Sequence, residues 1–485
     1  MLLLLCLLAC KDKGDDSGAP RGRAFPEGFL WGASMAGFQV DPGCPTIPAE
    51  DCEDRGSDWY VWVTDPELVA ESGNHLSGQP LSEGPGYWEL YDQDLALAQQ
   101  QLGLGAVRTS LEWSRLFPDD PGDAISTVDD LAALADAAAV AAYHDQLASM
   151  AAHGLQPMLT LNHYTLPTWL HDAKGCHEDL STCEDKGWVD RDRILHHLAL
   201  YAGYCAREFG GEVDLWLTLN EPLAVVLSGY LMPTEDRTNP PGVIDPDAAF
   251  AVMLAQVEAH AVMYDAVHAE DATAMVGAAP NLAAVTPQDP DDADDQLGVE
   301  HFDYLYNRVF LNGTVRGEWD PDLDGVVDEV RQDLLGRSDF VGLNYYTRIT
   351  VDGLGFQLFD QTPLFDFLPV GGFWESYPQG LYEVTMLAAE YGLPIYITEN
   401  GNSTWSGDPT GDFLLPHLHA LADAIDDGAD VRGYFYWSLV DNYEWNHGTA
   451  MEFGLLDVDD ATKARSPRPM ALDYAEIAGS NALPE

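Results

Sequence analysis

The sequence predicts an α/β protein, a single (β/α)8 barrel, and three observations support this fold class. Eight short apolar runs rich in β-favouring residues recur along the chain. Stretches with the 3.6-residue apolar periodicity of helices lie between most of these runs. No break in composition divides residues 25–475. Strands that alternate with helices favour a parallel barrel, with the active site at the C-terminal strand ends.

Each expected strand is an apolar segment bounded by residues that favour turns. In chain order, we expect strands at 28–36, 106–113, 157–164, 214–220, 274–280, 339–345, 394–399 and 432–438. Each expected helix repeats apolar residues every three or four positions, which gives it one face to pack on the sheet. In chain order, we expect helices at 87–102, 131–153, 194–209, 248–269, 381–391 and 413–427.

Two of these strands end in a glutamate followed by a residue that breaks the strand. The segment Leu217–Pro222 carries Glu221 just before a proline, and Ile395–Gly401 carries Glu399 just before an Asn-Gly turn. In a barrel, strands four and seven would deliver both carboxylates to the same end. Cleavage of a glycosidic bond needs such a pair, because one group protonates the leaving oxygen while the other attacks or stabilises the anomeric carbon. Among 81 Asp and Glu residues, either glutamate alone would more simply be a surface acid.

Other polar residues fall at the same predicted end of the barrel. A lone His or Arg in a strand is more often structural than functional, but a ring of polar side chains at one barrel end favours a binding or catalytic site. The ring comprises Gln39, Arg108, His163, Asn344, Tyr346 and the segment 437–445 after strand eight.

The charge composition argues against several kinds of partner. The formal net charge is -59, from 81 Asp and Glu against 22 Lys and Arg. Such a surface repels nucleic acid and anionic lipid headgroups, so we expect neither as a partner. Its self-repulsion weakens as salt shortens the Debye length from about 10 Å at 0.1 M to about 3 Å at 1 M. We therefore hypothesise adaptation to saline surroundings, with an ordinary acidic secreted protein as the alternative.

The first ten residues, MLLLLCLLAC, predict an export signal, because ten apolar residues are too few to span a bilayer. The segment 7–10 resembles the lipobox of bacterial lipoproteins, in which the cysteine, here Cys10, carries the lipid. Residues 11–24 predict a flexible tether, and residues 25–478 the barrel. The predicted location is the bacterial cell envelope, with the lipid as the only membrane attachment. Secretion or a periplasmic location is the alternative.

Five cysteines remain beyond the leader. Cys44 and Cys52 flank one polar loop, and Cys176 and Cys183 flank another, so each pair predicts a disulfide in an exported protein. Neither pair is accompanied by a second pair at zinc-ligand spacing, which argues against zinc. Cys205 lies in an apolar helical stretch and is expected to be a buried thiol.

The loop 320–328 has the spacing of a calcium-binding loop. Position twelve, usually a bidentate glutamate, is Arg331 here, and an acidic protein also forms such spacing in solvated loops. Any calcium is expected to be structural, since catalysis is expected to need no cofactor. The candidate ligands are Asp320, Asp322, Asp324 and Asp328.

Longer segments around the polar ring resemble glycoside hydrolase family 1, the β-glucosidase and β-glycosidase family. They include FLWGASMAGFQ (29–39), LTLNEP (217–222), FVGLNYYTR (340–348), IYITENG (395–401) and WSLVDNYEW (437–445), and the resemblance covers roughly residues 25–475. It implies retaining hydrolysis of a β-linked, non-reducing terminal sugar. Glucose is the first candidate, with galactose or fucose next.

The resemblance also implies a role for each catalytic residue. Glu221 would be the general acid/base and Glu399 the nucleophile, supported by Arg108, Asn344 and Tyr346. Retaining chemistry places the two carboxyls about 5 Å apart. Contacts with Arg108 and Tyr346 would keep Glu399 ionised, and this neighbouring charge would keep Glu221 protonated.

For the sugar, the resemblance implies a larger set of binding residues. The carboxylate of Glu444 would repel a 6-phosphate, which implies an unphosphorylated sugar. The chain departs from the family at Tyr164, where most members carry Trp, and at residues 40–42, where Ile-Glu-Gly is usual. The implied binding residues are Gln39, His163, Asn220, Trp437, Glu444, Trp445 and Phe453.

Several functional alternatives remain open. The enzyme could be a β-galactosidase or a broad β-glycosidase, or it could run mainly transglycosylation in the same site. A non-catalytic sugar-binding surface lipoprotein is less favoured, because both glutamates and their supporting Arg and Tyr persist. The expected partner is a β-glycoside or oligosaccharide, and the sequence leaves the oligomeric state open.

Overall fold

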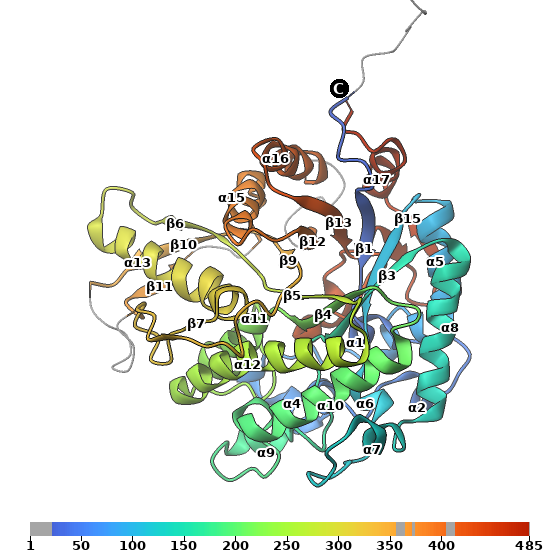
Figure 1. The fold of residues 1–485 in the computed structure, drawn as a ribbon. Helices are drawn as coiled ribbons and strands as arrows, with labels where there is room; N and C mark the ends of the chain where they lie inside the picture. The colour runs from blue at the N-terminus through green and yellow to red at the C-terminus, as the bar shows by residue number, and fades with distance from the viewer. Residues whose placement is uncertain (1–21, 356–363, 371–373, 404–412, 485) are drawn as a thin grey trace, which may run out of the picture.

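Eight parallel strands form a nearly closed barrel in the computed structural model, which describes residues 22–355, 364–370, 374–403 and 413–484 (Figure 1). The strands follow one another in the hydrogen-bonded order β5-β4-β3-β2-β1-β13-β12-β9. The predicted fold class is confirmed, and all eight expected strands are present. They are β1 Leu30–Ser34, β2 Ala106–Ser110, β3 Gln156–Asn162, β4 Leu215–Asn220, β5 Met275–Ala279, β9 Val341–Asn344, β12 Ile395–Asn400 and β13 Val431–Trp437.

The ring closes between β5 and β9, the two strands at the ends of this order. The backbone nitrogen of Asp339 donates to the Val276 carbonyl at 2.8 Å, and its carboxylate accepts from the Val276 nitrogen at 2.9 Å. Asn281 and Asn344 then pair as an isolated parallel bridge. These contacts hold the two edges together on both sides of the short strand β9.

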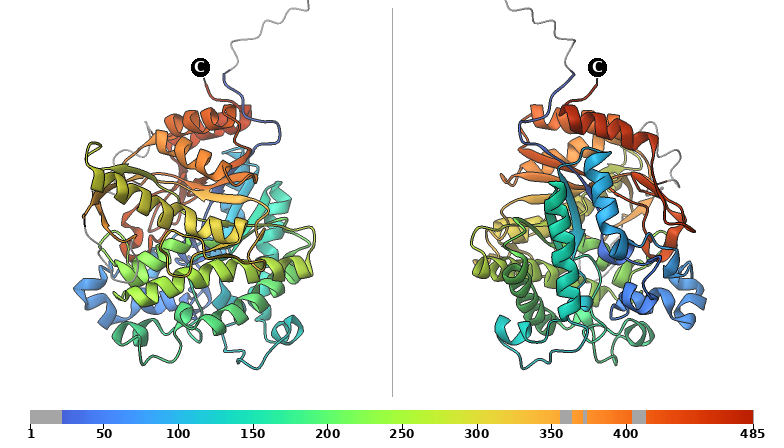
Figure 2. Two further views of the ribbon diagram at one scale, coloured as in Figure 1. Left: turned by 60° about the vertical axis from the view of Figure 1, so that its left-hand side comes forward. Right: turned by 90° about the vertical axis from the view of Figure 1, so that its right-hand side faces the viewer.

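The helices that follow the strands pack around the outside of the barrel (Figures 1 and 2). The expected helix at 131–153 is interrupted, because the side chain of Asp136 caps a new helix by accepting from the nitrogens of Ala138 and Ala139. No helix among the described residues is both long and apolar enough to cross a membrane. The principal helices are α5 Tyr87–Gln100, α7 Val128–Ala132, α8 Ala137–His153, α10 Arg191–Phe209, α12 Pro246–Glu270, α15 Pro378–Ala389, α16 Leu414–Asp426 and α17 Pro469–Ser480.

A small three-stranded sheet lies beside the barrel and was not predicted. Strand β10 (Arg348–Gly353) pairs in parallel with β6 (Ala284–Pro287) and antiparallel with β11 (Phe367–Val370). Helix α13 (Ala293–Asp303) lies with these strands on one side of the molecule (Figure 1). The sheet grows from the connections after β5 and β9, so it stands near the C-terminal ends of those strands.

The remaining elements are short. Two-stranded pairs are formed by β7 Glu318–Trp319 with β8 Glu329–Val330, and by β14 Leu456–Val458 with β15 Arg465–Pro467. The short helices are α1 Gly37–Val40, α2 Ala49–Cys52, α3 Asp58–Thr64, α4 Pro66–Ala70, α6 Trp113–Leu116, α9 Ala173–Glu178, α11 Pro222–Val226 and α14 Val309–Leu311.

The structure joins the cysteines in the pairs that the sequence predicts, Cys44 with Cys52 and Cys176 with Cys183. Cys205 is a buried free thiol, as expected, and burial raises the pKa of this thiol well above its usual range. The predicted leader with its lipidation site at Cys10, and all but the last residues of the predicted tether, lie outside the described residues.

Candidate active site

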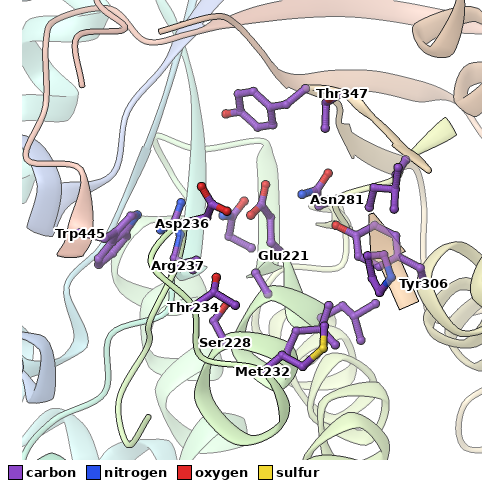
Figure 3. A pocket seen from close by; sticks show the side chains of 18 of the residues that line it. Glu221, Ser228, Met232, Thr234, Asp236, Arg237, Asn281, Tyr306, Thr347 and Trp445 are labelled. Atoms are coloured by element: carbon purple, nitrogen blue, oxygen red, sulfur yellow. The ribbon is translucent and has the colours of Figure 1, made fainter. Parts of the chain in front are cut away.

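The two strand-end glutamates line one pocket at the C-terminal end of the barrel, and Figure 3 shows Glu221 in this pocket. Glu221 directly follows β4, and Glu399 is the fifth residue of β12. Both side chains are buried. The pocket encloses about 1610 Å³ including its open mouth. The polypeptide therefore brings together two carboxyls that are far apart in the sequence, as the motifs predict.

Two donors fix the carboxylate of Glu399. Arg108 Nη1 donates to Oε1 at 2.5 Å, and the Tyr346 hydroxyl donates to Oε2 at 2.6 Å. Burial raises the pKa of Glu399 to about 7, and nearby Glu221 adds to this rise, whereas Arg108 and Tyr346 oppose it. The two carboxyls interact, so the protonation of Glu399 depends on the charge of Glu221. The guanidinium favours placing the negative charge of the pair on Glu399.

Glu221 is held by a different pair of donors. Asn344 Nδ2 donates to Oε1 at 3.0 Å, and the hydroxyl of Tyr164 contacts Oε2 at hydrogen-bonding distance. The backbone of Glu221 is left-handed, with φ of 43°, just before Pro222 opens helix α11. A non-glycine residue takes this conformation at a cost, and such strain concentrates at functional sites.

Asn220 links a donor of Glu399 to a donor of Glu221. Its Oδ1 accepts from Arg108 Nη2 at 2.7 Å and from Asn344 Nδ2 at 3.0 Å. The sequence assigns Asn344 to the support of the nucleophile, but the structure directs its amide nitrogen to Glu221 and Asn220. Its side-chain oxygen accepts from the Thr398 hydroxyl at 2.7 Å. Asn344 therefore orients the partner glutamate rather than the carboxylate of Glu399.

His163 is a neutral imidazole in the floor of the pocket. Burial lowers its pKa well below the usual range, and the nearby charges of Arg108 and Arg237 lower it further. A neutral ring can accept at Nε2 from Asn220 Nδ2, 3.1 Å away. Nδ1 is then protonated, and it has no protein partner among the described residues. It can donate to a ligand hydroxyl.

Glu444 is surrounded by donors from three segments. Its Oε2 accepts from Gln39 Nε2 at 2.8 Å and from Asn442 Nδ2 at 2.7 Å. Its Oε1 accepts from Arg237 Nη2 at 2.8 Å. In the described part of the chain, Gln39 Oε1 and Arg237 Nη1 have no protein partner. Arg237 was missed by the sequence reasoning, because it lies in an irregular loop that no strand-end pattern indicates.

Aromatic rings complete this polar half of the pocket. The ring of His163 stacks on Trp437 with centroids 5.8 Å apart and on Trp445 at 6.0 Å. Trp437 packs with Phe453 in one buried cluster, and both line the pocket. Such faces suit the C–H surfaces of a sugar ring, whose hydroxyls would meet the surrounding polar atoms.

The other half of the pocket is apolar and was not predicted. Leucine, methionine and phenylalanine side chains line it beyond Glu221, from the π-helical turn 227–231, the helical segment around Tyr306 and the sheet beside the barrel. Figure 3 shows Tyr306 on the side of Glu221 opposite to Trp445, with Met232 below. The residues come from long connections, whose sequences carry no periodic or motif signal.

An eight-stranded barrel with two buried carboxyls in one pocket, beside aromatic rings and unpaired polar atoms, defines an enzyme of the glycoside-cleaving class. A sequence model of glycosyl hydrolase family 1 matches residues 22–483. The chain belongs to this family, and it is a glycosidase.

Two kinds of relative support this membership. The β-galactosidase of Pyrococcus woesei is 33% identical over 511 residues, covering 95% of this chain and 98% of the relative. Among solved structures, the β-glycosidase of Thermosphaera aggregans has a TM-score of 0.81 at 30% identity, covering 95% of this chain and 98% of its own. A hyperthermophilic β-glucosidase from Pyrococcus furiosus has a TM-score of 0.80 at 30% identity, covering 95% and 97%.

The predicted calcium loop forms the tip of the β7–β8 hairpin. Carboxylate oxygens of Asp320, Asp322 and Asp324 lie within 4.8 Å of one another, whereas Asp328 is not part of this group. Asp320 is buried and already accepts from the Gly325 nitrogen at 2.9 Å and the Tyr304 hydroxyl at 2.6 Å. Three carboxylates are a reasonable ligand set for calcium. Calcium binding here stays a prediction.

Proposed function

We propose that this glycosidase is a retaining exo-β-glycosidase that releases terminal non-reducing β-D-glucosyl residues, with galactosyl and fucosyl residues as further substrates. The observation that carries the proposal is the unequal setting of the two glutamates. Glu399 faces a guanidinium and a phenol, while Glu221 faces an amide and a phenol in the same pocket. A charged carboxylate beside a neutral acid is what double displacement needs.

In the first step, the Glu399 carboxylate attacks the anomeric carbon as the bond to the leaving oxygen breaks. Glu221 gives its proton to that oxygen, so the aglycone leaves as a neutral alcohol. Arg108 stays 2.5 Å from the nucleophile and stabilises its charge until the ester bond forms. The sugar is then covalently attached to the enzyme.

In the second step, the esterified Glu399 carries no charge, so Glu221 is no longer forced to hold a proton. Glu221 takes a proton from an entering water as the water oxygen attacks the anomeric carbon. The ester bond breaks and Glu399 regains its carboxylate, which returns both glutamates to their starting state. Two inversions at the anomeric carbon give net retention.

The glycone fits the polar half of the pocket. Gln39 Oε1 and His163 Nδ1 offer an acceptor and a donor that the described protein leaves unpaired. Buried polar atoms without a partner are costly, and sugar hydroxyls would satisfy them. The carboxylate of Glu444 disfavours a phosphorylated sugar, although Arg237 neutralises part of its charge.

Galactose stays a competing glycone. The Pyrococcus woesei relative is named a β-galactosidase, and the Pyrococcus furiosus structure is titled a β-glucosidase. The two sugars differ only at the 4-hydroxyl. We expect the groups around Glu444 to contact the 4-hydroxyl and so to distinguish the two sugars.

A panel of aryl β-glycosides tests the proposal. We expect turnover of the glucoside, with galactoside and fucoside weaker, and proton NMR should detect the β-anomer of the free sugar first. Release of the α-anomer first would refute the retaining mechanism. Glycosyl transfer to added alcohols, measured in the same reactions, gives the balance between hydrolysis and transglycosylation.

Two further proposals concern the setting of the enzyme. The leader and its Cys10 support export with lipid attachment at the cell envelope, and Cys10→Ser should abolish labelling by a radioactive fatty acid. Labelling that persists in this variant would contradict the proposal. The net charge of -59 supports adaptation to salt. Thermal melts in low and molar NaCl test it, because an unchanged melting temperature removes the electrostatic argument.

A further inference from the structure

The pocket continues past the two glutamates into a space that we call the apolar chamber. The apolar chamber is lined by Leu227, Leu231, Met232, Phe302, Leu305 and Phe367. Leu231, Phe302, Leu305 and Phe367 are buried by their neighbours, yet they face an open cavity that is continuous with the catalytic pair. Apolar walls around an open cavity favour an apolar occupant.

The chamber begins next to the acid/base, and its far wall is well packed. Burial raises the pKa of Tyr306 well above its usual range, and the charge of nearby Glu221 adds to this rise. On the far wall, the rings of Phe302 and Phe367 lie 5.1 Å apart in an edge-to-face contact. An occupant of the chamber would therefore be joined to the oxygen that Glu221 protonates, which makes it the leaving group.

We propose that the apolar chamber binds an extended apolar aglycone, an alkyl chain or a fused hydrocarbon ring system, of the glycoside that this site cleaves. This inference rests on the proposed function. A second sugar in the chamber would place its hydroxyls against leucine and phenylalanine and leave them unpaired, which is costly. Among the described lining residues, Ser228, Asn281 and the phenol of Tyr306 offer polar atoms on this side of the pocket, and leucine, methionine and phenylalanine make up most of its wall.

A homologous series of n-alkyl β-glucosides from ethyl to octyl tests the inference, at concentrations below micelle formation. Full burial of a methylene gives up to about a fourfold gain in kcat/KM. We expect the ratio of kcat/KM for octyl to that for ethyl glucoside to exceed 100-fold. A flat series with normal turnover of aryl glucosides overturns the chamber proposal and leaves the proposed function standing. No turnover of any β-glycoside overturns both.

A polar substitution in the wall sharpens the test. Leu227→Gln places an amide in the half-buried turn that faces the chamber, and we expect it to lower the octyl-to-ethyl ratio at least tenfold. Leu134→Gln is the matched control. Leu134 is half-exposed and is not among the residues that line the pocket, so this variant should keep the octyl-to-ethyl ratio. Equal ratios in both variants would overturn the assignment of the chamber to the aglycone.

A different observation concerns Tyr164, whose phenol lies against the acid/base. Tyr164 is buried, its backbone is left-handed with φ of 71°, and its hydroxyl contacts Glu221 Oε2. Its ring packs against Trp445 at 5.0 Å between centroids. The phenol oxygen is the group of Tyr164 that reaches the acid/base.

We infer that Tyr164 is a positioning residue for the acid/base. Together with Asn344 on the other oxygen, it holds the Glu221 carboxyl in one orientation toward the leaving oxygen. A donated hydrogen bond also favours the charged form of that carboxyl, the form that takes a proton from water in the second step. This inference also rests on the proposed function, and a failure of Glu221→Ala to lower turnover would overturn both.

Tyr164→Phe removes only the phenol oxygen. Dinitrophenol leaves without protonation, whereas an alkyl alcohol needs it. We expect kcat/KM to fall about tenfold for ethyl glucoside and less than twofold for 2,4-dinitrophenyl glucoside, since one lost hydrogen bond to a charged group is worth about 1.5–3 kcal/mol.

Tyr345→Phe is the matched control. It removes another buried phenol, which donates to the Tyr377 carbonyl at 2.6 Å, away from both carboxyl groups. It should leave the ratio between the two substrates unchanged. Equal losses on both substrates in Tyr164→Phe would show that Tyr164 only packs, and would overturn the inference.

Discussion

The two halves of the pocket are built in opposite ways. Apart from Arg237, which comes from a loop, the polar half takes its groups from the ends of barrel strands and the segment after β13, and hydrogen bonds and ion pairs fix them, as Arg108 fixes Glu399. The apolar half takes its side chains from the π-helical turn 227–231, the segment around Tyr306 and the sheet beside the barrel. The chemistry therefore lies in the part of the fold that the barrel specifies, and the choice of aglycone lies in its connections.

The halves also differ in what a substitution should cost. Removal of one partner from a buried charge leaves the other charge unpaired, which costs about 3–5 kcal/mol for a buried ion pair. Loss of apolar area costs only about 25 cal/mol per Å². The polar half should therefore respond steeply to single substitutions, and the apolar half gradually.

Loss of either catalytic glutamate should give the largest effect. We expect Glu399→Ala and Glu221→Ala each to lower kcat by about 10⁴-fold or more, as removal of a group that acts in bond cleavage does. Azide should restore turnover in Glu399→Ala, giving a glycosyl azide of inverted configuration, because the small anion attacks where the carboxylate was. Unchanged activity in either variant would refute the assignment of both roles.

Arg237 should give the next largest effect. Arg237→Gln leaves Glu444 Oε1 without its cation, and we expect kcat/KM for aryl glucosides to fall about 10–100-fold, since a hydrogen bond to a charged group is worth about 1.5–3 kcal/mol. Arg432→Gln, a variant of a half-exposed arginine that pairs with Asp430, is the control and should retain full activity. A loss confined to octyl glucoside would mean that Arg237 belongs to the apolar half.

The sequence predicts the polar half well, for a physical reason. The C-terminal ends of parallel strands meet at one end of a barrel, so eight apolar runs with polar residues after them are enough to bring His163, Glu221 and Glu399 into one pocket. The same rule brings the buried Arg108 into contact with Glu399. The sequence could not show the direction of one hydrogen bond. Asn344 sits between two glutamates, and only the packed geometry shows that it donates to Glu221.

The apolar half follows a different rule. Its walls depend on how long connections fold against one another, and an isolated Leu227 or Phe367 in a loop or short strand is indistinguishable from an ordinary core residue. Arg237 was missed for the same reason, because only the folded loop brings its guanidinium to Glu444. The change at Tyr164 was visible in the sequence, but its contact with Glu221 was not.

The loss of activity at low pH, the acid limb of the pH profile, should also distinguish the polar half of the pocket from the apolar half. The pKa of Glu399 is raised to about 7, and the reaction needs its ionised form. Activity is therefore lost as pH falls through about 7, and kcat/KM should drop about tenfold for each further pH unit. Tyr346→Phe removes a donor that lowers this pKa, so the limb should move to higher pH.

Tyr306→Phe, on the apolar side of the pocket, is the comparison for that shift. Its phenol makes no direct contact with Glu399 among the described hydrogen bonds, so the acid limb should stay where it is. An equal shift in both variants would contradict the division of the pocket. If activity instead falls within the ordinary pKa range of a glutamate, Arg108 lowers the pKa of Glu399 more than burial raises it.

Calcium should give the smallest effect, on the apolar half alone. Asp320 accepts from the hydroxyl of Tyr304, the residue before Leu305 in the chamber wall, so an ion at the β7–β8 loop would brace that wall. We expect calcium chloride to raise the melting temperature by about 2–5 °C, from the stabilisation that a bound ligand gives its folded form. Asp322→Asn should abolish the shift, and Asp291→Asn, at another exposed loop, should keep it.

If the chamber wall depends on calcium, the ion should also increase the preference for octyl glucoside over ethyl glucoside. Removal of calcium by EDTA should lower the octyl-to-ethyl ratio while the ethyl rate holds, since no residue of the loop 320–328 is among those that line the pocket. An unchanged melting temperature would contradict calcium binding at this loop. A rate that falls equally for both glucosides would show that the loop supports the barrel as a whole, and that the two halves of the pocket are less independent than their construction implies.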